Sequence, residues 1–159
     1  MNQKPFATVA ALVLLAFGAL GSAHAQSTSP ACNNKLIRGN FGVTIQGTKL
    51  AGPGPTGSQV GVAVVEYDGK GNFTQLDTVT IGGEVVADFT HTPATGTYKV
   101  NPDCTGTFTI NFTDGRPTVT TNFVVVDNGN EIDAVVTSAG GNPGILATAS
   151  VSKRRFTGQ

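Results

Sequence analysis

The sequence contains no tryptophan, a single methionine at its start and only two cysteines, and 13% of its 159 residues are charged. Leucine, glutamate and lysine are also scarce, whereas threonine, valine and glycine are abundant. Threonine and valine are branched at Cβ, which restricts them in a helix and suits them to a sheet, and glycine supplies tight turns. This composition predicts an all-β protein with negligible helix.

The chain also lacks an excess of charge of either sign, because ten Lys and Arg residues face ten Asp and Glu residues. A nearly neutral surface has neither the electrostatic footprint of a nucleic-acid-binding protein nor a polybasic membrane-binding stripe. The run Lys153-Arg154-Arg155 is the exception, and we interpret it as a solvated tail. We therefore expect no nucleic-acid partner.

Long hydrophobic runs are absent after the N-terminus. Residues 1–25 are typical of a signal peptide, with a positive charge at Lys4, an apolar stretch over 9–20 and the cleavage pattern Ala23-His24-Ala25. The apolar stretch is too short to span a bilayer, and no later segment is long enough to do so. We expect cleavage near Ala25, no membrane insertion, and a secreted or periplasmic protein.

After such cleavage two cysteines and one histidine remain, namely Cys32, Cys104 and His91. In an oxidising compartment an isolated cysteine pair usually forms a structural disulfide. A bridge between Cys32 and Cys104 is therefore predicted, stabilising the fold by about 4 kcal/mol if loop-closure entropy dominates. The three residues have no metal-ligand spacing, so neither a metal nor another cofactor is predicted.

Nine segments have the composition or alternation of strands, and most are joined by two to five residues. Such short connections force antiparallel neighbours, and closing the meander removes its exposed edges. We predict one antiparallel up-and-down β-barrel of about eight or nine strands, with a two-sheet β-sandwich as the alternative. Residues 26–35 would form a leader, 36–155 the barrel domain and 156–159 a tail. The predicted strands are 36–46, 59–67, 73–81, 84–90, 97–101, 107–113, 118–126, 131–137 and 145–152.

The connections themselves are interpreted as backbone turns. Residues 49–58 contain two prolines and three glycines and form the longest connection, at one end of the sheet. The turn 68–72 faintly resembles a calcium loop, but Lys70 occupies a ligand position, so a hairpin explains it better. A cation site formed by Asp127, Glu131 and Asp133 is the alternative to a solvated hairpin end around the Asn-Gly pair, and the hairpin end is preferred.

Polar residues that fall in phase with apolar ones are the better candidates for a site. If Phe73 faces inward, strict alternation turns Gln75 and Asp77 inward as well. A buried carboxylate is costly without a partner, so this arrangement would indicate a ligand site. A bulge near Leu76 that resets the alternation and places Asp77 outside is the simpler interpretation.

Tyr98 is the third candidate: its hydroxyl, like that of Tyr67, can project into the interior, and the alternative for both residues is that they simply cap the core. His91 lies at a strand end, where an exposed histidine is ordinary. No Gly-x-Ser-x-Gly nucleophile motif accompanies it, so catalysis by His91 is not favoured. The candidate ligand-binding residues are Tyr98, Asp77 and Gln75.

Three runs, at 36–42 (LIRGNFG), 67–73 (YDGKGNF) and 96–107 (GTYKVNPDCTGT), resemble a group of small exported bacterial proteins of uncharacterised function. That group is similar in turn to the barrel shared by allene oxide cyclases and dirigent proteins. The resemblance implies the same barrel fold over most of 32–151. No catalytic set of those enzymes falls on matching positions here, and none is carried over.

The function favoured by the sequence is a non-enzymatic binding or structural module for a small apolar ligand or an envelope component. A barrel of eight strands has room for one small ligand, and a catalytic motif is missing. A cyclase- or isomerase-type enzyme that uses the barrel interior is the alternative, since shaping a substrate requires few catalytic groups. The oligomeric state is left open.

Overall fold

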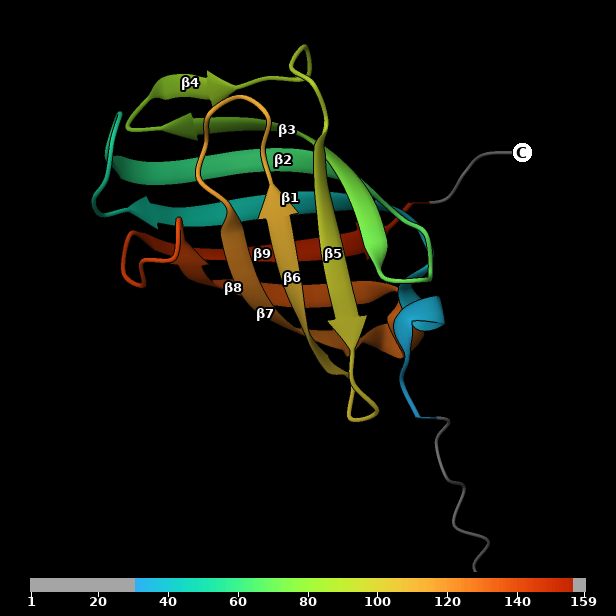
Figure 1. The fold of residues 1–159 in the computed structure, drawn as a ribbon. Coiled ribbons are helices and arrows are strands. Elements are labelled where there is room, and N and C mark those ends of the chain that lie inside the picture. The colour runs from blue at the N-terminus through green and yellow to red at the C-terminus, as the bar shows by residue number, and fades with distance from the viewer. Residues whose placement is uncertain (1–30, 156–159) are drawn as a thin grey trace, which may run out of the picture.

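The computed structural model describes residues 31–155, so the predicted signal peptide, the first half of the leader (26–30) and the tail 156–159 lie outside the described residues. The described part is almost entirely β-structure (Figure 1). Within it, no helix has the length and hydrophobicity needed to cross a membrane. The elements in chain order are η1 (Asn34–Ile37), β1 (Gly39–Lys49), β2 (Gly57–Tyr67), β3 (Asn72–Ile81), β4 (Glu84–Ala87), β5 (Ala94–Val100), β6 (Thr105–Asn111), β7 (Val119–Val126), η2 (Asp127–Gly129), β8 (Glu131–Ala139) and β9 (Leu146–Arg154).

Eight of the nine strands close into an antiparallel up-and-down barrel, and β4 is an extra strand on β3. The ring runs β1, β2, β3, β5, β6, β7, β8, β9, so its strands follow one another in chain order, and β9 pairs with β1 to close it. The prediction of a single closed barrel is confirmed, and the sandwich alternative is wrong. The predicted strand 84–90 is the main difference, because only Glu84–Ala87 is extended and it lies outside the ring.

The barrel is split beside β3. β3 pairs with β5 only from Asn72 to Gln75, where Gln75 lies opposite Ala94. Farther along, β3 turns to β4 instead, and their register shifts between Val79 and Thr80. The second half of β3 stays paired with β2, but no strand ladder joins it to β5, so side chains must close the wall on that side.

One end of the interior is solid and is called the aromatic end. Its rings pack edge-on or stacked, with Tyr67 lying 5.3 Å from Phe41 and 5.2 Å from Tyr98 between ring centroids. Two glycines make room for these rings, since a Cβ on Gly96 would lie 2.1 Å from Phe73 Cζ. A Cβ on Gly106 would similarly lie 2.2 Å from Phe123 Cζ. The six rings of the aromatic end are those of Phe41, Tyr67, Phe73, Tyr98, Phe108 and Phe123.

The predicted disulfide between Cys32 and Cys104 is confirmed, with 5.0 Å between the two Cα atoms. It ties the segment before η1 to the turn between β5 and β6, where the Cys32 N–H also donates to Pro102 O at 3.2 Å. η1 closes the aromatic end by burying Ile37. A buried disulfide of this kind fits an oxidising compartment.

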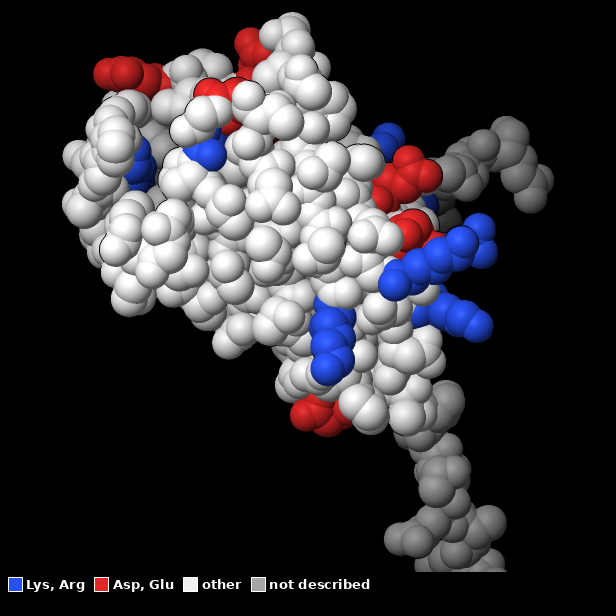
Figure 2. All heavy atoms as spheres, viewed as in Figure 1, with Lys and Arg blue, Asp and Glu red and all other residues white. Residues whose placement is uncertain are grey.

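The outer surface of β2 carries apolar side chains. Val60 and Val62, which share an apolar phase along β2, point outward and are about half exposed. The inward phase of β2 instead carries Gln59, Ala63 and Val65. Figure 2 shows charged side chains lying mainly toward the two ends of the barrel, with uncharged side chains covering most of the face between them.

Replacing both cysteines, Cys32→Ala with Cys104→Ala, should lower the free energy of unfolding without changing the fold. The disulfide spans 72 positions of the sequence. Its loss frees the unfolded chain and costs about 4 kcal/mol by loop-closure entropy. Urea unfolding of the two forms measures the loss, and circular dichroism of the native variant should still show a β-sheet spectrum. Equal unfolding midpoints would contradict the assigned role.

Candidate functional site

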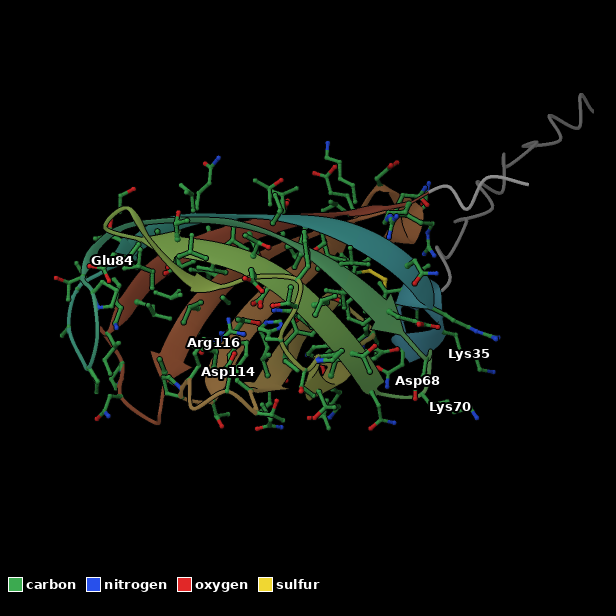
Figure 3. The ribbon with its side chains drawn as sticks, turned by 90° about the horizontal axis from the view of Figure 1, so that it is seen from above. Lys35, Asp68, Lys70, Glu84, Asp114 and Arg116 are labelled. Carbon is green, nitrogen blue, oxygen red and sulfur yellow. A yellow bond between two sulfur atoms is a disulfide. The ribbon has the colours of Figure 1, made fainter. Side chains whose placement is uncertain are left out.

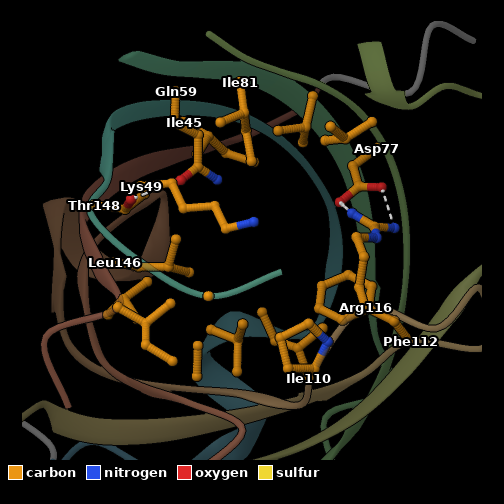
Figure 4. A pocket seen from close by; sticks show the side chains of 18 of the residues that line it. Ile45, Lys49, Gln59, Asp77, Ile81, Ile110, Phe112, Arg116, Leu146 and Thr148 are labelled. Atoms are coloured by element: carbon orange, nitrogen blue, oxygen red, sulfur yellow. Dashed lines mark hydrogen bonds and ion pairs between the residues drawn. The ribbon is translucent and has the colours of Figure 1, made fainter. Parts of the chain in front are cut away.

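The barrel end opposite the aromatic end encloses a cavity of about 630 Å³. This size lies within the range of about 300–1,000 Å³ that small-molecule sites occupy. We call it the hollow end; the connection 50–56 between β1 and β2 and the connection 112–118 between β6 and β7 border it (Figure 4). Most of the wall is aliphatic, including Val43, Ile45, Val79, Ile81, Ile110 and Leu146.

Asp77 is the charged group buried in this wall, with a side chain that is 2% exposed. Arg116 binds it with two parallel contacts, Nη1 to Oδ2 at 2.9 Å and Nη2 to Oδ1 at 3.0 Å. Gln75 Nε2 also donates to Asp77 Oδ2 at 3.2 Å. His91 Nε2 lies 2.6 Å from Oδ1. Both carboxylate oxygens are therefore fully engaged by protein groups.

Arg116 comes from the connection between β6 and β7 and reaches across the split to β3 (Figure 4). Its guanidinium also binds Asp114, with Nε 2.9 Å from Oδ2, and stacks 3.9 Å from the centre of the Phe112 ring. Figure 3 places Asp114 and Arg116 together, away from Asp68 and Lys70 at the aromatic end. The side chains thus close the part of the wall that the strand ladder leaves open.

The charges of this cluster are fixed by its own contacts. Burial alone would lower the pKa of Arg116, but hydrogen bonds to Asp77 and Asp114 raise it above its ordinary value. Burial alone would raise the pKa of Asp114, but the hydrogen bonds and charge of Arg116 bring it below its usual range. Arg116 and Asp114 therefore remain a charged pair at neutral pH.

His91 lies in the connection between β4 and β5, and its side chain is only 12% exposed. The expectation of an ordinary exposed histidine is therefore wrong, because the ring is drawn in against Asp77. Nε2 lies 2.6 Å from an Asp77 oxygen and 2.9 Å from Arg116 Nη2, and it cannot donate to the first and accept from the second at once. If Nε2–H donates to the carboxylate, the acceptor is Nδ1, which is buried with no partner among residues 31–155.

The predicted bulge near Leu76 is absent from the described β3, and the interpretation that placed Asp77 outside is wrong. β2 and β3 pair in unbroken register from Tyr67 opposite Phe73 to Gln59 opposite Ile81. Strict alternation therefore turns Gln75 and Asp77 inward. The cost of burying the Asp77 carboxylate is offset by Arg116, which belongs to a segment that the sequence analysis treated only as a turn.

The three candidate residues occupy two different places. Gln75 and Asp77 lie together in the cavity wall. Tyr98 lies in the aromatic end and is not among the residues that line the cavity; its hydroxyl donates to Asn34 O at 3.2 Å. Burial raises the pKa of Tyr98, so the hydroxyl stays protonated.

The sequence analysis missed several polar residues of the hollow end. Thr148 Oγ1 donates to Gln59 Oε1 at 2.9 Å, and both side chains are buried. Lys49, the last residue of β1, points its ammonium into the cavity (Figure 4). Gln59 was detectable as a polar residue in phase with Ala63 and Val65. Arg116 and Lys49 have no such signal, because their placement depends on how the connections fold over the barrel.

The two turns considered as cation sites are explained by their own hydrogen bonds. Asp68 Oδ1 accepts from the backbone N–H groups of Lys70, Gly71 and Asn72. The side-chain hydrogen bond from Asn72 holds the pKa of Asp68 well below its usual range. At the other turn Glu131 pairs with Lys153 at 3.2 Å. No group of three potential metal ligands occurs in the part of the chain that the structure describes.

Comparison of the chain with protein-family models, with curated proteins and with solved structures finds no match. The resemblance to the allene oxide cyclase and dirigent barrel therefore stays a prediction. The site is interpreted from its own geometry.

Replacing Arg116 with methionine should destabilise the protein by about 3 kcal/mol, because it leaves the Asp77 carboxylate buried without its cation. The double variant Asp77→Leu with Arg116→Met should recover most of this loss, since it removes both charges. Lys70→Met, at the exposed turn before β3, is the matched control and should change little. Thermal unfolding of the four proteins measures the effects; equal losses in the single and double variants would contradict the pairing.

Thr121 offers a second test of the wall. Its Oγ1 is buried and lacks a hydrogen-bond partner among the described residues, and its side chain is 5% exposed. Thr121→Val keeps the shape and should raise the free energy of unfolding by about 1 kcal/mol. Thr148→Val is the matched contrast, because it breaks the bond to Gln59 and should lower stability by about 1 kcal/mol. Chemical denaturation that gave both variants the same sign would contradict this difference.

Proposed function

We propose that this protein binds one small, mainly apolar molecule inside the hollow end of the barrel. The observation that carries the proposal is the cavity of about 630 Å³ with its largely aliphatic wall. A well-packed barrel of this size normally fills its interior with side chains, so an apolar space of ligand size needs an explanation. An apolar cavity bordered by a few polar groups is the usual form of a small-molecule site.

The charged cluster supports binding more than catalysis. Asp77 accepts contacts from Arg116, His91 and Gln75, which leaves its carboxylate no free oxygen with which to take a proton from a substrate. His91 does not line the cavity. The cluster therefore stiffens the wall across the split. A cyclase- or isomerase-type enzyme is the second candidate, favoured by the position of these charges at the edge of an apolar cavity.

We also propose that the protein is exported from the cytoplasm. The buried disulfide suits an oxidising environment, and residues 1–25 have the pattern of a signal peptide. The barrel would then act in the periplasm or outside the cell, where it could hold an apolar molecule in water. A structural role through an envelope component would not require the cavity, and for that reason it ranks lower.

Binding of the neutral fluorescent probe N-phenylnaphthylamine tests the proposal. The probe should bind with enhanced, blue-shifted emission. Val136→Trp places a large ring in the cavity wall and should weaken binding at least about tenfold, or about 1.4 kcal/mol. Val135→Trp is the matched control, because Val135 is the adjacent residue of β8, points outward and is 51% exposed. It should leave the affinity unchanged.

Circular dichroism and thermal unfolding should show both variants folded. If the probe did not bind the parent protein, or bound the two folded variants equally, the barrel cavity would not be its binding site. Either result would contradict the proposal.

A further inference from the structure

Lys49 is the feature of the cavity that the proposed function does not explain. It ends β1 at the rim of the hollow end, and its side chain points into the cavity (Figure 4). Its ammonium donates to Pro53 O in the connection 50–56. A Cβ built on Gly54 would lie 3.6 Å from Nζ, which shows how closely this connection lies over the group. An ammonium has three N–H donors, so two are left for another partner.

The carboxylates around the cavity do not neutralise Lys49. Asp77 and Asp114 both line the cavity, and both are bound by Arg116. Lys49 forms no ion pair with any carboxylate of residues 31–155. The hollow end thus contains the Arg116 guanidinium, which two carboxylates bind, and the Lys49 ammonium, which no carboxylate of the described residues binds. Lys49 is half-buried at the rim, where a charge attracts an anion more strongly than it does in bulk water.

A second polar group next to Lys49 also lacks a partner. Gln59 is 8% exposed, and its Oε1 accepts from the Thr148 hydroxyl at 2.9 Å. The Nε2 of the same amide donates no hydrogen bond within the described structure, although it lies in the cavity wall. Figure 4 shows Lys49, Gln59 and Thr148 on one side of the cavity and the Asp77–Arg116 pair on the other. We call the side of the cavity formed by Lys49, Gln59 and Thr148 the lysine side; it has hydrogen-bond donors that no acceptor of the described residues binds.

We propose that the ligand is an amphipathic anion: its apolar body fills the aliphatic cavity, and its single anionic group is bound by Lys49 Nζ and Gln59 Nε2. This inference rests on the proposed function, because it concerns the same cavity. It adds the chemical class of the ligand and the residues that select it. A neutral ligand that displaced water from Lys49 and Gln59 would leave their free N–H groups without an acceptor, which costs free energy.

Two probes with one skeleton separate the inference from the proposed function. Anilinonaphthalene sulfonate and N-phenylnaphthylamine share their rings and differ in one sulfonate group. The parent protein should bind the sulfonate more tightly, and the difference should shrink as salt is added. Lys49→Met should weaken sulfonate binding about tenfold and leave the neutral probe within about twofold, whereas Lys49→Arg should retain most of the sulfonate affinity.

Lys70→Met is the matched control, because it removes the same charge from an exposed turn at the aromatic end. It should leave the affinity for both probes unchanged. Val136→Trp should weaken both probes, which places both of them in the cavity. Fluorescence titration at fixed ionic strength gives all the dissociation constants.

The outcomes are distinct. Binding of the neutral probe together with sulfonate binding that is insensitive to Lys49→Met would overturn the anion inference and leave the proposed function standing. Equal weakening of both probes by Lys49→Met would also overturn it, since the lysine would then only shape the cavity. Failure of both probes to bind the parent protein would overturn the proposed function and the inference together.

Discussion

The ion pair between Asp77 and Arg116 is the constraint on which the hollow end depends. β3 leaves β5 after Gln75 and pairs with β4, so no ladder of hydrogen bonds closes the wall at this point. Arg116 spans the split from a connection on the far side and binds Asp77 with both terminal nitrogens. A buried pair of this kind contributes little net stability, because desolvation offsets the attraction. Its consequence is geometric: it fixes the connection 112–118 against β3 and so defines one side of the cavity.

The two ends of the barrel differ in how their interiors are filled. At the aromatic end six rings, a disulfide and η1 fill the interior, and glycines at Gly96 and Gly106 let the rings approach the backbone. The tight packing there excludes a ligand. At the hollow end the apolar side chains that line the cavity are mainly valine and isoleucine, which are too short to meet across the barrel. A cavity therefore forms where the large residues are missing.

Much of the fold was predictable, because it depends on local signals. Turn residues between short alternating segments force antiparallel neighbours, and Cys32 and Cys104 were the sole pair available for a disulfide. The faces of the strands were less predictable. On β2 the valines at Val60 and Val62 point outward, and the inward phase carries the polar Gln59. Alternation cannot show which of the two faces of a strand is inward when the apolar residues occupy the outer face.

For Asp77 the alternation was correct, but its burial required a cation from a distant connection. No local sequence pattern indicates that Arg116 binds Asp77 or that Lys49 points into the cavity.

The polarity of the cavity follows from which charges are already satisfied. Arg116 is the stronger anion receptor by chemistry, but two carboxylates occupy its donors, so it cannot take a ligand without breaking its hold on β3. Among the described residues the Lys49 ammonium contacts only the backbone carbonyl of Pro53, and this contact does not hold β3. In the proposed binding mode the charged group of the ligand therefore lies beside Lys49, beneath the connection 50–56. Its apolar body then extends over the aliphatic wall toward the aromatic end, where the packed rings set the limit of its length.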